Sequence, residues 1–369
     1  MDYALILAAM AIIALGLVTI ASATQVTSAP GEGSFGFVYK QLLGIALGTA
    51  VFSFFLLWRY EELTRYARVL YGANLGTLLA VLLIGHSAGG AQRWVQIGPF
   101  LFQPSEFAKL AVIIGLAVFL SQREGRLDRF QDLLPALAYV GVPTLLILAQ
   151  PDLGTALVFV AITVGMLYVA GARPLLLATL TLGGLGSMVT WIWAHLNHGL
   201  WIPLKDYQLD RLTIFLDPWS DWQGAGYHMI QSQIAIGAGG LWGRGLFNGS
   251  QNQLHFLPEQ HTDFIFSVLA EELGLIGVVF LLGIFFILIY RGLRIAAQAK
   301  DLFGTLLAAG IVSMLTFHVL TNVGMTAGIM PVTGLPLPLF SYGPSSMITN
   351  LAALGLLCNV WLRRQMIVF

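Results

Sequence analysis

Charged side chains are scarce in this chain. Only 10% of its 369 residues are Asp, Glu, Lys or Arg, while 57% are hydrophobic and the mean hydropathy is +0.81. In ordinary soluble domains the charged fraction is about 25%. The composition therefore excludes a soluble domain and predicts a polytopic membrane protein.

Net charge and cysteine are also lacking. Eighteen basic and eighteen acidic side chains cancel to a formal charge of zero, so no attraction to nucleic acid is expected and no nucleic-acid partner is predicted. The single Cys358 cannot form an intramolecular disulfide. The loops outside the membrane must therefore hold their shape without covalent links.

Several catalytic signatures are missing from the sequence. None of the four lysines follows a glycine, which excludes a phosphate loop of the Walker A type, and none lies three residues after a serine, which excludes the Ser-x-x-Lys motif of acyl transfer. No His-Glu-x-x-His zinc signature occurs. The glycine-dense segment 237–249 follows no predicted strand, so a dinucleotide site is rejected as well.

Long apolar runs dominate what is present. Ten runs have about the 17 to 25 residues that a membrane-spanning helix needs. The predicted fold is an all-α polytopic integral membrane protein with about ten transmembrane helices, in a single membrane domain that covers 1–369. The expected spans are roughly 3–22, 39–58, 67–85, 104–121, 133–149, 152–170, 174–195, 263–290, 303–328 and 344–362.

Basic residues indicate the orientation of these spans. Twelve of the eighteen lie between an even-numbered span and the next odd-numbered one, or after the last span. Because cytoplasmic loops carry an excess of Lys and Arg, both termini are predicted to be cytoplasmic. The twelve are Arg59, Arg65, Arg68, Arg123, Arg126, Arg129, Arg173, Arg291, Arg294, Lys300, Arg363 and Arg364.

Two outward segments are candidates for function. The first, 196–262, is predicted to be one large extracytoplasmic loop, too long for a simple connector, and its Trp201–Trp219 stretch is typical of an interfacial amphipathic segment. The second, 328–347, contains four prolines. Irregular backbone of this kind is tolerated at membrane depth only around a cavity.

Ionisable residues in the eighth run are the most informative. Asp263 falls in the first turn of the run, at the outer water boundary, while Glu271 and Glu272 lie deeper. Charged groups at membrane depth are costly and usually functional. Thr262 also fits an N-cap, and an acid in the first turn suits the helix dipole, so a catalytic and a structural interpretation of Asp263 both stay open. For the two glutamates, pairing between spans is favoured.

Six basic residues remain on the outward side: Lys40, Arg93, Lys109, Lys205, Arg211 and Arg244. A solvated position is preferred for Lys40, whereas the others are candidates to hold an anion in an outward cavity. Glu106 and Lys109 share one helical face at i, i+3 and can also form a buried ion pair that neutralises itself. Asp152 is interpreted as an N-cap, with Thr155 at the N3 position.

Four motifs carry a resemblance to a known family. They are FQPSEFAKLA at 102–111, QPDLGTAL at 150–157, the long segment 224–274 and NVGMTAGIMPVTGLPLPLFSYG at 322–343. Together they resemble the SEDS family of bacterial cell-wall proteins, named for shape, elongation, division and sporulation, and resemble its elongation branch more than its division branch. Pro344 departs from the family pattern, which has a second glycine after Ser-Tyr-Gly.

The resemblance implies an enzyme of the bacterial cytoplasmic membrane. It would be a peptidoglycan glycosyltransferase that polymerises lipid II, the undecaprenyl-diphosphate-linked disaccharide pentapeptide, at the outer face of the membrane for cell elongation and rod shape. The implied partner is a class B penicillin-binding protein that supplies the transpeptidase activity. The family's essential acid corresponds to Asp263.

Roles for the site residues follow as hypotheses. Asp263 is a general base, or the ligand of a divalent cation such as Mg²⁺ or Mn²⁺, because the acceptor hydroxyl must lose a proton while the lipid diphosphate leaves. Glu106 is expected to line the same cavity. Candidates to hold the diphosphate are Arg93, Lys109, Arg211 and Arg244, and candidates for sugar contacts are Gln208, Glu259 and His261.

Two other functions compete with this one. A lipid II flippase would use the same ten spans and the same outward anion cavity, but it would need polar residues along a path to the cytoplasm. The polar residues are instead concentrated in the outer half. A scaffold that only recruits the partner would leave Asp263 and the outward cations unexplained.

Overall fold

The computed structural model describes residues 1–25, 36–88, 91–97, 100–123, 127–202, 206–222, 224–253, 256 and 260–364. In this part of the chain nine helices are long and apolar enough to cross a membrane, and one further apolar helix has 17 residues. Nine of the ten predicted spans are thereby confirmed as helices of spanning length, and the shorter helix corresponds to the tenth. The helices are α1 (Tyr3–Thr24), α2 (Gly36–Leu57), α3 (Leu63–Ile84), α4 (Pro104–Ser121), α5 (Phe130–Ala149), α6 (Leu153–Val169), α7 (Pro174–His198), α11 (Ile265–Ala297), α12 (Leu302–Thr326) and α13 (Pro344–Leu362).

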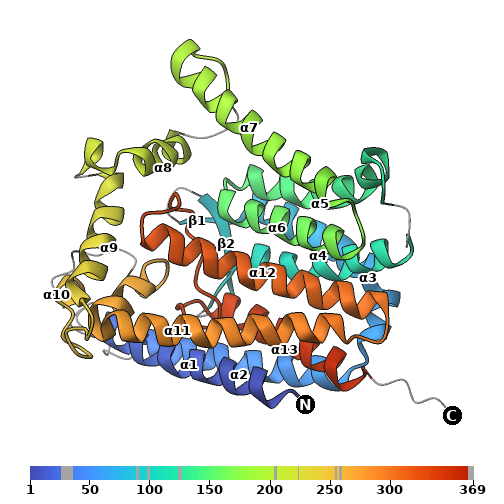
Figure 1. Ribbon diagram of the computed structural model, residues 1–369, viewed down its shortest axis with the longest axis horizontal. Coiled ribbons are helices and arrows are strands. Elements are labelled where there is room, and N and C mark those ends of the chain that lie inside the picture. Colours follow the sequence, from blue (N-terminus) through green and yellow to red (C-terminus); the bar gives the residue numbers. More distant parts are fainter. Residues whose placement is uncertain are drawn as a thin grey trace.

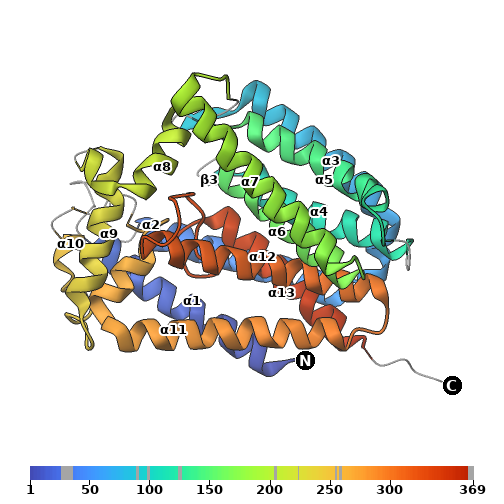
Figure 2. The same ribbon diagram turned by 45° about the horizontal axis from the view of Figure 1, so that its top comes forward.

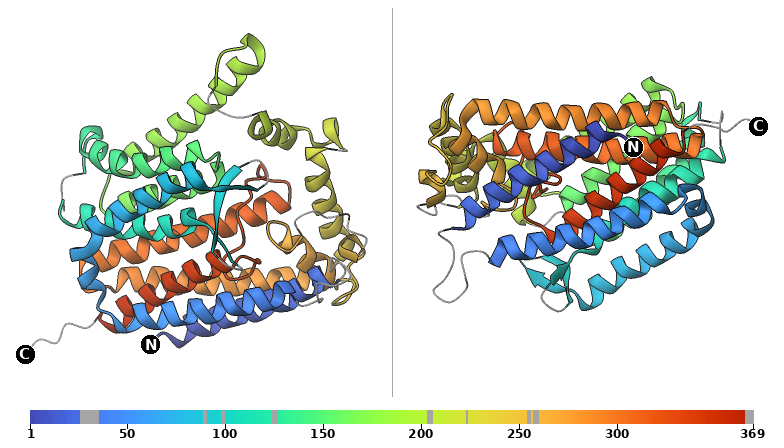
Figure 3. Two further views of the ribbon diagram at one scale, coloured as in Figure 1. Left: turned by 180° about the vertical axis from the view of Figure 1, so that it is seen from behind. Right: turned by 90° about the horizontal axis from the view of Figure 1, so that it is seen from below.

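These helices form one bundle in which successive helices run in opposite directions (Figures 1 and 2). The start of α1 and the end of α13 lie toward the same end of it, which we call the end of the termini, as an even number of spans requires (Figure 3). We call the opposite end the distal end. Most of the inter-span basic residues follow helices that finish at the end of the termini, which agrees with the predicted orientation.

The centre of the bundle is formed by α4, α12 and α13, whose apolar residues are mostly buried. Small residues allow the close approach of neighbouring helices: Gly310 of α12 leaves room for Ile113 and Met166, and Gly355 of α13 faces the backbone of Phe52. In contrast, α7 has a single buried residue, Leu177, and projects from the bundle (Figure 1). It is the most loosely held of the long helices.

The distal end carries structure that span prediction alone does not give. After α3 the chain forms a three-stranded antiparallel sheet of β1 (His86–Ala88), β2 (Ala91–Ile97) and β3 (Phe100–Phe102), in the order β1-β2-β3. The all-α prediction lacked this sheet, because two of its strands have only three residues. The predicted 196–262 loop is largely helical, with α8 (Asp206–Leu216), the 3-10 helix η2 (Pro218–Asp221), α9 (Ala225–Gly239) and α10 (Ser250–Gln253).

Helix α11 is broken at Gly274, which has φ 64° and ψ −166°. The glycine-dense loop after α9 fills the break with its own peptide groups. The amides of Arg244 and Gly245 donate to the carbonyls of Glu271 and Glu272, at 3.0 and 2.9 Å. The amide of Leu275 in turn donates to a carbonyl of this loop, that of Gly240, at 2.9 Å. The loop therefore satisfies peptide groups that the break would leave unpaired, and a short helix, Ile265–Leu273, stands apart from the longer remainder of α11.

Candidate active site

Asp263 lies in the turn that precedes this short helix, at the distal end, and its side chain is half-buried. Its carbonyl accepts a hydrogen bond of 2.9 Å from the amide nitrogen of Asn322 in α12. The turn is also tied to the 331–343 loop, because the amide of Tyr342 donates to the carbonyl of His261 at 3.0 Å. The predicted acid therefore stands where the backbone is held from two sides.

Gly334 lies close to both the Asp263 carboxylate and the guanidinium of Arg211. A Cβ placed on Gly334 would stand 3.3 Å from Asp263 Oδ2 and 3.9 Å from Arg211 Nη1. The acid and the guanidinium therefore face one small region of space, and a side chain on Gly334 would fill it. The backbone of Gly334 has φ +71°, which glycine adopts without strain. The structure thus brings together two of the predicted site residues, Asp263 and Arg211.

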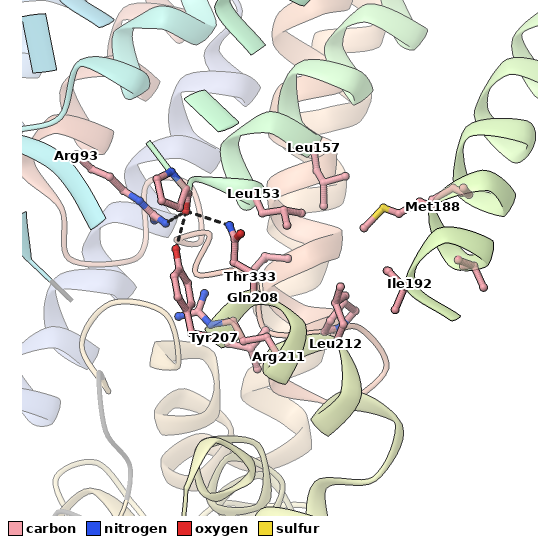
Figure 4. Close-up of a pocket in the computed structure, with 15 residues that line it drawn as sticks. Arg93, Leu153, Leu157, Met188, Ile192, Tyr207, Gln208, Arg211, Leu212 and Thr333 are labelled. Carbon is pink, nitrogen blue, oxygen red and sulfur yellow. Dashed lines mark hydrogen bonds between the residues drawn. The ribbon is translucent and has the colours of Figure 1, made fainter. Parts of the chain in front are cut away.

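A cavity of about 240 Å³ opens beside Arg211 (Figure 4). One wall is apolar and comes from α6 and α7, where Leu157, Met188 and Ile192 face the space. The opposite wall comes from α8, with Tyr207, Gln208, Arg211 and Leu212, and from Pro331, Val332 and Thr333 of the 331–343 loop. A mostly apolar cavity with a cation at one edge suits a lipid with an anionic head group.

A corner of this cavity is built around the carbonyl of Pro151 (Figure 4). It accepts hydrogen bonds from Arg93 Nη2, from Tyr207 at 3.0 Å and from Gln208 Nε2 at 3.4 Å. The Arg93 guanidinium also lies 3.6 Å from the carboxylate of Asp152, which caps α6 by accepting from the Thr155 amide, as predicted. Arg93 and Gln208 therefore lie at the cavity, but Arg93 shares its charge with Asp152.

Glu106 and Lys109 form a buried ion pair of 2.7 Å on α4. Lys109 Nζ also lies 3.1 Å from His318 Nε2, and His318 Nδ1 lies 3.2 Å from the carbonyl of Pro336. Because that carbonyl can only accept, Nδ1 carries the proton and Nε2 accepts from Lys109. Through His318, the ion pair is connected to the carbonyl of Pro336 and so supports the 331–343 loop. Both side chains are buried in the bundle and neither belongs to the wall of the described cavity, so the expected place of Glu106 beside the substrate stays a prediction.

Arg244 belongs to a different network, beside the break in α11. Its guanidinium donates to Ser250 Oγ at 2.6 Å and to the carbonyl of Ala238 at 3.3 Å, and Ser250 Oγ donates to the buried Glu271 at 3.1 Å. Ser22 of α1 donates to Glu272. Pairing between spans, as favoured for the glutamates, is found for Glu272, whereas Glu271 pairs with α10. Arg244 does not line the described cavity, and its role toward a diphosphate stays a prediction.

The remaining predicted residues are less well defined by the structure. His261 is half-buried, with its ring 4.7 Å from that of Phe37 and 5.5 Å from that of Tyr342. Glu259 and Lys205 lie outside the described residues. Lys40 is exposed on α2, in agreement with its preferred solvated position.

Four residues of this region were not singled out from the sequence: Tyr207, His318, Asn322 and Gly334. The signal for His318 and Asn322 was present, because a polar residue inside an apolar run usually has a specific partner. Tyr207 and Gly334 gave no comparable signal, since their importance depends on which distant segments face them.

Comparisons with known proteins show the family of the chain. The family model of cell cycle proteins that includes FtsW, RodA and SpoVE matches residues 2–366. The chain belongs to this family. The peptidoglycan glycosyltransferase MrdB of Escherichia coli is 40% identical over 346 residues, which cover 94% of this chain and 91% of the relative. The stage V sporulation protein E of Bacillus subtilis is 39% identical, over 97% of this chain and 96% of the relative. The resemblance stated from the motifs is confirmed.

Solved structures of the family have the same fold. One is a chain from a complex described as a peptidoglycan synthase that coordinates polymerization and crosslinking; it matches with a TM-score of 0.79 at 35% identity, over 98% of each chain. The rod shape determining protein RodA of Thermus thermophilus matches with a TM-score of 0.71 at 32% identity, over 99% of this chain and 98% of the other. The chain is a multi-pass membrane protein of this fold.

Proposed function

We propose that this member of the family polymerises lipid II at its distal end, with Asp263 as the general base. The chain is a peptidoglycan glycosyltransferase, as its family and its named relatives indicate. The observation that supports the assignment of the base is that Asp263 and Arg211 both lie close to Gly334. In this reaction the acceptor hydroxyl attacks the anomeric carbon, its proton passes to the Asp263 carboxylate, and the bond to the lipid diphosphate breaks.

The two halves of the donor suit the two kinds of surface in the cavity that Arg211 lines. The apolar side chains of α6 and α7 suit a polyprenyl chain, and Arg211 at the cavity edge suits a diphosphate. A unit charge pair at 4 Å is worth about 4 kcal/mol at an effective dielectric constant of 20. Arg211 therefore stabilises the charge that develops on the leaving group, so one carboxylate base suffices, unlike the carboxylate pair of a glycosidase.

A divalent cation with Asp263 as its protein ligand is part of this proposal. Mg²⁺ is commonly bound by one or two carboxylates together with substrate phosphates, and the side chain of Asp263 is only half-buried. Among the described residues no group of three or more His, Cys, Asp or Glu side chains could hold a metal, so the diphosphate would have to supply further oxygen ligands. The cation would add positive charge near the leaving group.

We place the enzyme in the bacterial cytoplasmic membrane, with the distal end outward, and assign it to cell elongation. Eleven of the twelve basic residues predicted to be cytoplasmic lie among the described residues, in or beside the connections at the opposite end, and support this orientation. A class B penicillin-binding protein is the proposed partner, in line with the synthase complex whose chain has the same fold. The described polar groups that favour a site, Asp263, Arg211 and the Pro151 corner, all lie at the distal end, and no observation favours the flippase.

The test is polymerisation of labelled lipid II by purified protein in detergent, with the partner present. Asp263→Asn keeps the shape of the side chain and removes its charge, and we expect no glycan chains on a gel. The matched control is Asp210→Asn, at an exposed position of α8, which should polymerise like the parent protein. Glycan synthesis near the parent rate by Asp263→Asn would contradict both the base and the metal-ligand roles.

A further inference from the structure

Asn322 forms hydrogen bonds with two segments of the site from the interior of the bundle. It lies on α12 and is fully buried. Its amide nitrogen donates to the carbonyl of Asp263 at 2.9 Å and to the carbonyl of Leu335 at 2.8 Å. An amide NH₂ has two hydrogens to donate, so both are used, one on each segment.

The two segments that Asn322 joins are those whose spacing matters for the reaction. One carries the Asp263 carboxylate, and the other carries Gly334, directly before Leu335. Gly334 lies close to both charged groups: a methyl group there would stand 3.3 Å from Asp263 Oδ2 and 3.9 Å from Arg211 Nη1. A shift of either segment by about 1 Å would therefore change where an acceptor hydroxyl can meet the base.

Packing alone does not explain an asparagine at this position. Its neighbours on α12 are largely apolar or small, and the adjacent Thr321 is equally buried, yet the Thr321 hydroxyl has no hydrogen-bond partner among the described residues. A buried amide is costly unless it is hydrogen-bonded; Asn322 Nδ2 has two partners, whereas its Oδ1 has none among the described residues. The position of Asn322 is thus explained by the two carbonyls it holds, which belong to segments about 70 residues apart in the sequence.

We propose that Asn322 is a positioning residue that sets the Asp263 carboxylate against the Gly334 wall. It acts on the backbone of the site and touches neither substrate nor cation. The inference rests on the proposed function of Asp263. Misplacement of a reacting group by about 1 Å lowers the rate by about 100-fold, so loss of Asn322 should act on turnover and leave the affinity for lipid II little changed.

The test compares Asn322→Leu with Thr321→Val in the full chain with its partner. Asn322→Leu removes both donors at similar size, and Thr321→Val removes an unpaired hydroxyl one residue away. We measure kcat and KM for lipid II, with kcat normalised to the fraction of molecules that bind labelled lipid II, together with the Tm of each protein. We expect kcat to fall about 100-fold for Asn322→Leu with KM within about twofold, and both constants to be unchanged for Thr321→Val.

Unchanged kcat in Asn322→Leu, or a raised KM with kcat intact, would overturn the inference. A purely structural role would appear as a smaller binding fraction with normal kcat per binding molecule, and would also overturn it. If Asn322→Leu does not fold, Asn322→His is the second variant, because it retains one ring N–H. It should show a smaller loss of kcat than expected for Asn322→Leu, at unchanged KM. A kcat of Asn322→His equal to that of the parent protein would then overturn the inference. If the parent protein makes no glycan, or Asp263→Asn does, the proposed function fails instead.

Discussion

Gly334 leaves open the space between the two charged groups of the site. A side chain there would contact the Asp263 carboxylate on one side and approach Arg211 on the other. The backbone around it is fixed through Leu335 and Asn322. At the scale of single residues, the reaction therefore depends on the lack of a side chain at Gly334 as much as on the charged side chains of Asp263 and Arg211.

We predict that Gly334→Ala lowers kcat/KM for lipid II by at least ~10-fold, because its methyl group occupies the space that the acceptor or diphosphate needs. Alanine also has a cost at positive φ, about 1–2 kcal/mol. Gly171→Ala is the control, since Gly171 has φ +93° and no atom within 4 Å of an added Cβ. Comparable activity of the two variants in the gel assay would show that the space is not used.

The Glu106–Lys109 pair gives a second prediction at this scale. Lys109→Met leaves the Glu106 carboxylate buried without its cation, which we expect to cost about 3–5 kcal/mol in the free energy of unfolding, whereas Glu106→Gln together with Lys109→Met should cost less. Denaturant unfolding in detergent measures the difference. Asp128→Asn is the control, because the Asp128–Arg173 pair is exposed and such pairs contribute little. Equal losses in the single and double variants would contradict the coupling.

The sequence allowed some of these residues to be found and not others. Asp263, Arg211 and Gln208 could be predicted because a charged or polar residue near an outer span end is conspicuous in an apolar chain. The partners of Arg93 and Lys109 could not, because they come from α6 and α12, far away in the sequence. Contacts of this kind depend on which spans pack together, which apolar runs do not specify.

At the scale of elements, the break in α11 divides this helix into a long part that can span the membrane and a short part beside the site. The long part after Gly274 has the length of a span, while the short helix before it carries Asp263 at its start. The glycine-dense loop that fills the break approaches so closely that side chains are excluded: a Cβ on Gly243 would overlap the carbonyl of Glu272. This is the physical role of the 237–249 segment, for which a dinucleotide site had been rejected.

We predict that Gly243→Ala destabilises the protein and lowers polymerisation, because the loop must withdraw from the break and the short helix loses its support. The conformational cost alone is about 1–3 kcal/mol. Gly240→Ala isolates that cost, since Gly240 has φ +55° but no atom within 4 Å of an added Cβ. The Tm in detergent should fall further for Gly243→Ala than for Gly240→Ala, and equal Tm values would argue against the loop as a support.

Element prediction succeeded where length and hydropathy determine the structure. The ten spans follow from bilayer thickness, and α12 (Leu302–Thr326) nearly coincides with the expected 303–328. It missed all three strands: β1 and β3 have only three residues, too few for a strand pattern, and the seven-residue β2 was not recognised either. It also missed the break at Gly274, since an apolar run gives no sign of a loop inserted into it.

At the scale of the whole molecule, the connections between spans divide into two groups. Those at the end of the termini are short and basic, whereas those at the distal end contain the sheet, α8 to α10 and the 331–343 loop (Figure 1). Segments from α8, α12 and the 331–343 loop therefore meet near Asp263. The loosely held α7 forms one wall of the cavity.

The central claim is glycosyl transfer at the distal end, and its most direct test is a reconstituted one. Proteoliposomes are prepared with the partner and divided into two samples. External protease is added to the first sample, and cleavage of the 196–262 loop shows that this loop faces outward. Labelled lipid II is then supplied only in the outer leaflet of the second, uncleaved sample. We predict glycan chains on the outside, with no label transferred to the inner leaflet. Transfer of intact labelled lipid to the inner leaflet without glycan product would contradict the account and support a transporter.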